Sequence, residues 1–121
     1  MSSSRRCSVG LAALAALALL PLLAWDLAPA RFPSGAHDAL GAAPLAAIAL
    51  AYLAVQVDRR PTAGAWVRSA IVAAAFLAWA ANQLWSKSPT ATAWNDLAIA
   101  LFVIDIVIAI FDRGLTPAPA P

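Results

Sequence analysis

The stretch Trp94-Asn-Asp-Leu-Ala-Ile-Ala-Leu-Phe-Val-Ile-Asp-Ile-Val-Ile-Ala-Ile-Phe111 decides how the rest of the chain is interpreted. A helix needs about 17–25 predominantly apolar residues to cross the hydrocarbon core of a bilayer, and this run is long enough. One carboxylate, Asp105, lies near its middle, where insertion scales give a charged side chain a cost of roughly 2.5–3.5 kcal/mol. The stretch therefore predicts a transmembrane helix with one polar residue that requires a partner.

The composition of the whole chain also favours lipid as its solvent. Of 121 residues, 63% are hydrophobic and 12% are charged, whereas a typical soluble domain has about 25% charged residues. A chain this small has too little polar surface to cover such an apolar interior in water. The net charge is +2, and the charged residues stand in short runs between the apolar segments. We therefore expect contact with a lipid bilayer and no binding of nucleic acid.

The pattern of apolar runs and breakers predicts four helices. They are expected at about 9–25, 39–57, 66–85 and 93–111, separated by short loops rich in proline, serine and charged residues. Helices joined by short loops pack side by side in opposite directions. The predicted fold class is all-α: an integral membrane four-helix bundle made of two antiparallel helical hairpins.

The predicted domain organisation is one transmembrane domain over residues 9–113. Residues 1–8 are expected to be a cytoplasmic lead, and residues 114–121 a flexible tail of proline and alanine. The first apolar run could also be a signal peptide, because Ala28-Pro29-Ala30 offers a small-x-small cleavage site. We favour a transmembrane helix because further predicted spans follow it.

The basic residues predict the orientation of the chain. Of the eight Lys and Arg residues, six lie on one side of the predicted membrane and two on the other. The first group is Arg5, Arg6, Arg59, Arg60, Arg68 and Arg113, and the second is Arg31 and Lys87. Because positive residues are retained on the cytoplasmic side, both termini are expected to be cytoplasmic, most simply in a bacterial inner membrane.

Depth in the membrane suggests a partner for Asp105. The third predicted span enters from the side by which the fourth leaves, so Arg68, near the start of the third span, is expected to lie at a similar level. An Arg68–Asp105 ion pair is the favoured arrangement. Two alternatives remain: Arg68 extends to the inner headgroups, or Asp105 is protonated and bonds to a carbonyl or to a hydroxyl such as that of Tyr52.

A second set of polar residues flanks the outer loop between the last two spans. It comprises Asn82, Gln83, Asn95 and Asp96. Antiparallel neighbours would bring these side chains together about one turn below the outer surface. They could clamp the two helices through hydrogen bonds, which is the interpretation we favour, or line a small polar vestibule.

Catalytic and metal-binding machinery is not predicted. The chain has one cysteine, Cys7, and one histidine, His37, so neither a Cys/His metal cluster nor a Cys/His or Ser/His/Asp catalytic set can be assembled. His37 and Asp38 stand at an expected helix start, where solvated polar groups are common. We expect no enzyme activity, no cofactor and no metal ion.

Two classes of function remain. The favoured one is an accessory or stabilising subunit, which needs only a packing surface for other membrane subunits or for a second copy. The alternative is an oligomeric small-solute or proton-coupled transporter or channel that uses Asp105. The small multidrug-resistance exporters are similar in length and helix number, but the essential carboxylate of that family lies on the first helix, and residues 9–25 contain none.

Overall fold

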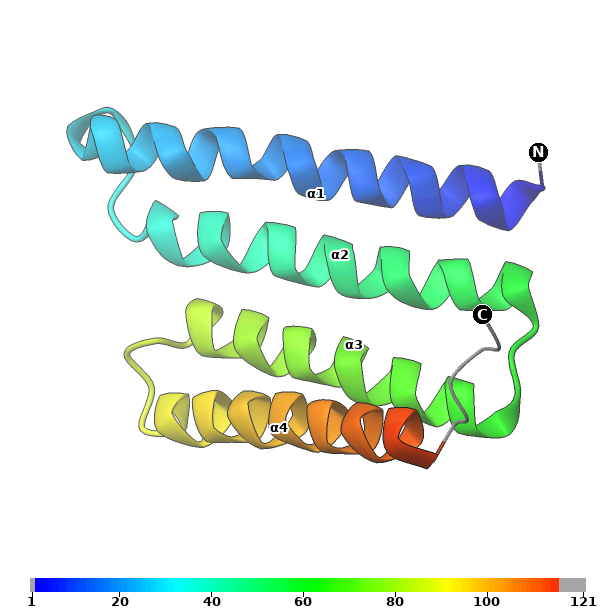
Figure 1. Cartoon of the computed structure of the whole chain (residues 1–121). Helices are drawn as coiled ribbons and strands as arrows, with labels where there is room; N and C mark the ends of the chain where they lie inside the picture. The colour runs from blue at the N-terminus through cyan, green and yellow to red at the C-terminus, as the bar shows by residue number, and fades with distance from the viewer. Residues whose placement is uncertain (1, 116–121) are drawn as a thin grey trace.

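The computed structural model describes residues 2–115, and of residues 113–115 only the backbone. It is all-helical, with α1 (Ser3–Leu27), the short 3-10 helix η1 (Pro29–Arg31), α2 (Ala36–Arg59), α3 (Ala63–Leu84) and α4 (Ala91–Leu115) (Figure 1). Each of the four α-helices is long and apolar enough to cross a membrane. The predicted all-α class with four potential spans is confirmed.

Two of the helices begin earlier than predicted because polar side chains cap them. The Ser2 hydroxyl accepts a hydrogen bond from the backbone N–H of Arg5, so α1 includes most of the predicted lead of residues 1–8. Thr62 caps α3 in the same way through the N–H of Ala65. At the other end of the chain α4 continues to Leu115, and the rest of the predicted tail lies outside the described residues.

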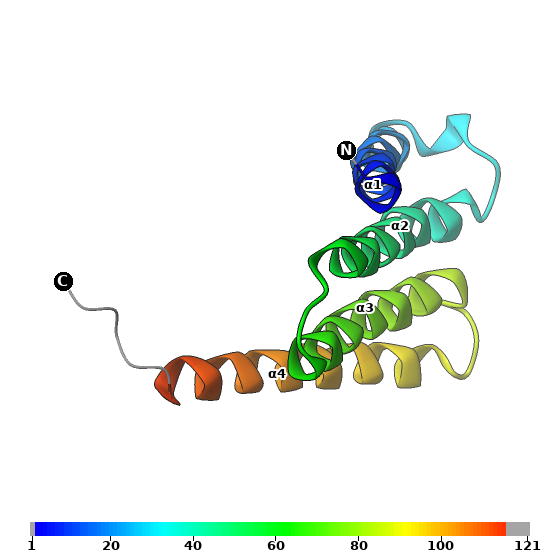
Figure 2. The same ribbon diagram turned by 90° about the vertical axis from the view of Figure 1, so that its right-hand side faces the viewer.

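The four helices form an open row. Each packs on its neighbours in sequence, α1 on α2, α2 on α3 and α3 on α4, with loops at alternate ends (Figure 1). Within the described chain α1 contacts neither α3 nor α4, and α2 does not contact α4. Figure 2 shows α1, α2 and α3 in succession and α4 crossing α3 at an angle. A closed four-helix bundle would bring α1 against α4, so the helices are arranged more openly than we expected.

Hydrogen bonds at the ends of the helices hold neighbours in register. The hydroxyls of Ser2 and Ser4, at the start of α1, both donate to Asp58 at the end of α2, Ser2 at 2.9 Å. At the other end of α2 the hydroxyl of Ser86, in the loop after α3, donates to Asp38 in the first turn of α2 at 3.1 Å. These contacts fix the register of α2 against both of its neighbours.

Apart from Gly41 and Pro44, the buried apolar residues of the described chain are all alanine. They are Ala15, Ala42, Ala47, Ala49, Ala51, Ala73, Ala75, Ala78, Ala80 and Ala98. Leucine, isoleucine, valine and tryptophan side chains are instead widely exposed on the outside of the row. This distribution is the reverse of that in a soluble domain, and it suits lipid, where small residues allow close packing of helices and large apolar residues face the acyl chains.

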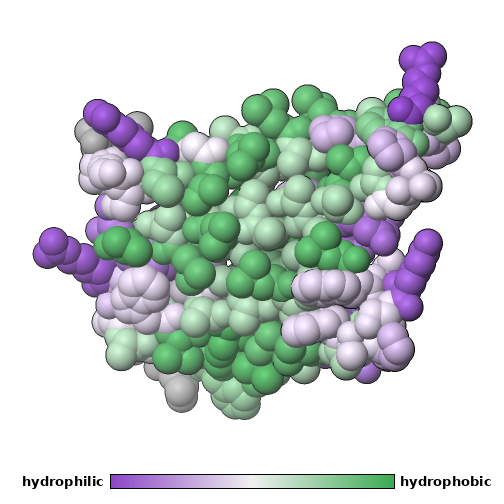
Figure 3. All heavy atoms as spheres, turned by 180° about the vertical axis from the view of Figure 1, so that it is seen from behind, coloured by the Kyte–Doolittle hydropathy of each residue, from purple (hydrophilic) through white to green (hydrophobic). Residues whose placement is uncertain are grey.

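Polar and apolar residues are separated on the surface. Figure 3 shows an apolar band across the middle of one face, with hydrophilic residues concentrated at the two ends of the helices. An apolar band between two polar ends matches the hydrocarbon core and headgroup layers of a bilayer.

Overpacking the alanine core should separate the helices. Ala75 is completely buried, and its neighbour Ala74 is exposed. We expect Ala75→Leu to lower the free energy of unfolding by about 1–3 kcal/mol, because added methylenes in a close-packed core force the backbones apart. Ala74→Leu, the matched control, should change it little. Thermal unfolding in detergent measures both, and equal effects would contradict the packing described.

Candidate functional site

Arg68 and Asp105 form an ion pair between α3 and α4. Arg68 lies in the second turn of α3, and a short loop turns α4 back along α3, so the start of α3 lies beside the later part of α4 (Figure 1). The Nη2 atom of Arg68 donates to Oδ1 of Asp105 at 3.2 Å. The structure thus brings together the two residues that depth in the membrane had suggested as partners.

A second carboxylate joins this pair. Asp112 lies seven residues after Asp105, two turns further along the same face of α4. Its Oδ2 atom is 3.8 Å from Nη1 of Arg68. The side chains are exposed by 14% for Asp105, 36% for Arg68 and 62% for Asp112, so the guanidinium connects an enclosed carboxylate to an accessible one. Asp112 was not among the residues predicted for this site, although its spacing of seven residues from Asp105 places it on the same helix face.

The guanidinium retains one unsatisfied donor. The Nε atom of Arg68 is buried and has no hydrogen-bond partner. The adjacent Ser69 hydroxyl does not satisfy it, because that hydroxyl donates to the carbonyl of Ala65 at 2.9 Å. Leaving a buried donor unpaired costs on the order of 1–3 kcal/mol. The three charged residues therefore form a network that is not fully satisfied.

Tyr52 does not take part in this network. It lies on α2, which makes no contact with α4 in the described chain, and it is 39% exposed. The alternative in which Asp105 is protonated and bonds to the Tyr52 hydroxyl is therefore not the arrangement observed.

The outer polar residues do not form one cluster. No hydrogen bond links Asn82, Gln83, Asn95 and Asp96 in the part of the chain whose side chains are described. Gln83 lies against α2, where its Oε1 atom would be 2.9 Å from a Cβ atom at Gly41. Asn95 lines a shallow pocket beside Trp79, and Asp96 is exposed. The expected hydrogen-bonded clamp is absent from the described residues, since Gln83, Asn95 and Asp96 lie in different surroundings.

Aromatic rings hold α3 and α4 together instead. Phe102 packs edge-on against Phe76, with ring centroids 5.2 Å apart, and against Trp79 at 6.3 Å. Nearer the loop, Trp85 stacks on Trp94 at 6.4 Å. Such pairs contribute about 0.5–1.5 kcal/mol each beyond the area they bury. They place α4 at the depth that brings Asp105 to Arg68.

The described residues offer no metal centre, since no group of three or more His, Cys, Asp or Glu side chains is placed to hold an ion. Comparison of the chain with known protein families, curated proteins and solved structures found no match. The chemistry of the site must therefore be argued from its own residues.

Removing the central ring should weaken the hairpin more than removing the outer amides. We expect Phe102→Leu to lower the free energy of unfolding by about 1–2 kcal/mol, because both of its ring contacts disappear. Asn82→Ala and Asn95→Ala should each change it by less than about 0.5 kcal/mol, since neither side chain has a hydrogen-bond partner to lose. Thermal unfolding in detergent provides the comparison. A larger loss of unfolding free energy for either asparagine variant would support the interpretation that the outer amides clamp the two helices.

A double-mutant cycle tests the ion pair. Arg68→Ala and Asp105→Asn should each destabilise the protein, and the double variant should be milder than their sum by on the order of 1 kcal/mol. The matched cycle of Arg68→Ala with Asp112→Asn should give a smaller coupling energy, because that contact is longer and more exposed. A coupling energy of zero between Arg68 and Asp105 would rule out the pair as a stabilising interaction.

Proposed function

We propose that this chain is a small integral membrane protein that acts as an accessory or stabilising subunit of a membrane assembly. The observation that carries the proposal is the open row: within residues 2–115, α4 lies at one end and contacts α3 alone. A helix that packs on one neighbour leaves most of its surface to lipid or to another protein.

The exposed face of α4 is suited to packing against another helix. It carries a stripe of β-branched residues at helical spacing, Ile99, Val103, Ile106 and Ile110, all of them exposed. β-branched side chains are held to few rotamers in a helix, so they lose little conformational entropy when a partner orders them. This favours a protein partner on α4.

The charge network supports the same conclusion. Asp105 is engaged by Arg68 at 3.2 Å, and one copy of the row does not enclose a path past it. A carboxylate held in an ion pair is poorly placed to exchange protons with a solute. The accessible side of the network, where the Asp112 side chain is 62% exposed, offers a polar contact at the edge of an interface.

An oligomeric proton-coupled transporter is the second candidate, and one observation favours it. Arg68 lies within reach of two carboxylates, so protonation of Asp105 would leave the guanidinium with Asp112 as its partner. That exchange would couple a proton to a shift of α4 against α3.

Copurification from native membranes separates the candidates. We expect one partner protein to copurify with a tagged chain in fixed stoichiometry. The double variant Val103→Ala with Ile106→Ala should lose this partner, because the β-branched stripe on α4 is truncated. Leu20→Ala with Leu23→Ala, equally exposed on α1, is the control and should retain it. A homo-oligomer whose stability depends on pH or on a solute, with no second protein, would favour the transporter.

The proposed orientation has its own test. Reporter fusions at the C-terminus should be active only when the reporter functions in the cytoplasm, and fusions within 27–36 only when it functions outside. A C-terminal reporter that is active outside would overturn the placement of both ends in the cytoplasm.

A further inference from the structure

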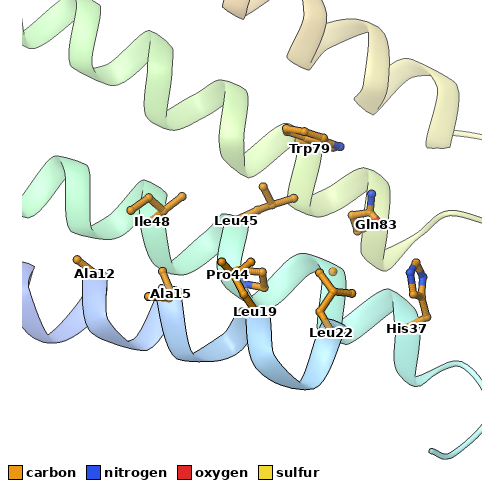
Figure 4. A pocket seen from close by; sticks show the side chains of 12 residues that line it. Ala12, Ala15, Leu19, Leu22, His37, Pro44, Leu45, Ile48, Trp79 and Gln83 are labelled. Carbon is orange, nitrogen blue, oxygen red and sulfur yellow. The ribbon is translucent and has the colours of Figure 1, made fainter. Parts of the chain in front are cut away.

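A groove lies on one face of the row, away from the Arg68 network. Its floor is α2 and its walls are α1 and α3, which do not contact each other (Figure 4). The volume is about 570 Å³, within the roughly 300–1,000 Å³ typical of small-molecule sites.

Small residues create this space. Ala12, Ala15 and Ala16 form part of the α1 wall, and Gly41 lies in the floor. A Cβ atom at Gly41 would approach Oε1 of Gln83 to 2.9 Å, so any larger residue at this position would project into the groove or displace Gln83.

The groove has a polar end and an apolar end. His37, in the first turn of α2, and Gln83, in the last turn of α3, both lie near the loops (Figure 4). Ile48 lines the groove eleven residues further along α2, about 16 Å deeper at 1.5 Å per residue. Only aliphatic residues and Trp79 line the part beyond His37 and Gln83.

Contacts with neighbouring residues fix the polar end of the groove. The ring of Trp25 packs on the imidazole of His37, with centroids 4.5 Å apart. The hydrogen bond from Ser86 to Asp38 ties the loop after α3 to the first turn of α2. His37 and Gln83 are thus carried by two helix ends whose relative position is fixed, at the level where an amphiphile in a bilayer keeps its head.

From this arrangement we infer that the groove binds an uncharged single-chain membrane amphiphile, with its chain along Ala15 and Ile48 and its head hydrogen-bonded by His37 and Gln83. Among the side chains that the structure describes, no Asp, Glu, Lys or Arg lines the groove, so a charged head would find no counterion there. Imidazole and amide groups each offer a donor and an acceptor, which suits a hydroxyl or carbonyl head.

A narrow chain fits the space better than a helix. A helix is about 10–12 Å in diameter with its side chains and could lie only over the open side of the groove, whereas a single acyl chain is thin enough to enter between α1 and α3. The inference rests on the proposed membrane location, but it does not depend on a partner at α4.

Quenching of Trp79 fluorescence can detect a brominated amphiphile bound in the groove. Single-tryptophan variants that keep either Trp79 or Trp66, with phenylalanine at the other tryptophans, are placed in phosphatidylcholine vesicles containing a small fraction of a monoacylglycerol whose chain carries bromine. Both residues are on α3 and similarly exposed, but only Trp79 lines the groove. We expect the fluorescence of Trp79 to be quenched more strongly than that of Trp66. Both residues meet brominated chains by chance in the bilayer, but only Trp79 also contacts the amphiphile bound in the groove.

Two substitutions and a control locate the binding. Gly41→Leu, which fills the groove, should abolish the preference for Trp79, whereas Gly10→Leu, which meets no atom within 4 Å, should preserve it. His37→Phe keeps a ring against the phenylalanine that position 25 carries in these variants and removes the hydrogen bonds, so it should reduce the preference without loss of folded protein. Unchanged circular dichroism and elution volume confirm folding of each variant.

Several outcomes would overturn the inference. Equal quenching of Trp79 and Trp66 in vesicles into which both insert would show that no amphiphile is selected, and failure to insert would instead refute the membrane location. Weaker quenching of Trp79 would show that a protein segment fills the groove. A preference that survives Gly41→Leu would place the site elsewhere, and equal preference for a brominated fatty acid would contradict recognition of an uncharged head.

Discussion

Close approach of neighbouring helices through alanine is the constraint on which the rest of this structure depends. In the membrane location proposed for this chain, the hydrophobic effect would not drive helices together, so their association would rely on van der Waals contact between well-matched surfaces. Alanine supplies that contact along the helix interfaces, for example at Ala49 and Ala75, which are both fully buried. Because each helix presents its small residues to its neighbours in sequence, and the loops are short, the chain forms a row and not a closed ring of helices.

The polar features follow from this row. The short connection between α3 and α4 and the rings around Phe102 set the relative depth of the two helices, and that depth brings Asp105 to Arg68. Toward the other end of α3, the absence of contact between α1 and α3 opens the groove over α2. An ion pair on one side of the molecule and an amphipathic groove on the other thus arise from the same serial packing, and neither requires a catalytic group.

Features that depend on depth along a helix could be predicted from the sequence, whereas those that depend on rotation about its axis could not. Hydropathy located the four spans, and counting residues from their ends placed Arg68 level with Asp105. The direction of Gln83 was missed, because α3 is apolar around most of its circumference and its sequence does not reveal which face meets α2. The Phe76–Phe102 contact and the open side of the row were missed for the same reason. Asp112 was overlooked because it follows the last predicted span, which ends at residue 111, and was not compared with the face of Asp105.

The distance between α1 and α4 in a bilayer tests the open row most directly. Spin labels on Cys7, which is exposed on α1, and on Ile110→Cys, exposed near the end of α4, measure this distance in samples diluted with unlabelled protein. Cys7 with Val57→Cys is the control pair, since α1 and α2 are neighbours. Helix axes pack about 8–10 Å apart, so we expect the axes of α1 and α4 to be separated by roughly 25 Å, and their labels to lie much farther apart than those of the control pair. Equal distances for the two pairs would mean that the helices close into a bundle and would contradict the open row.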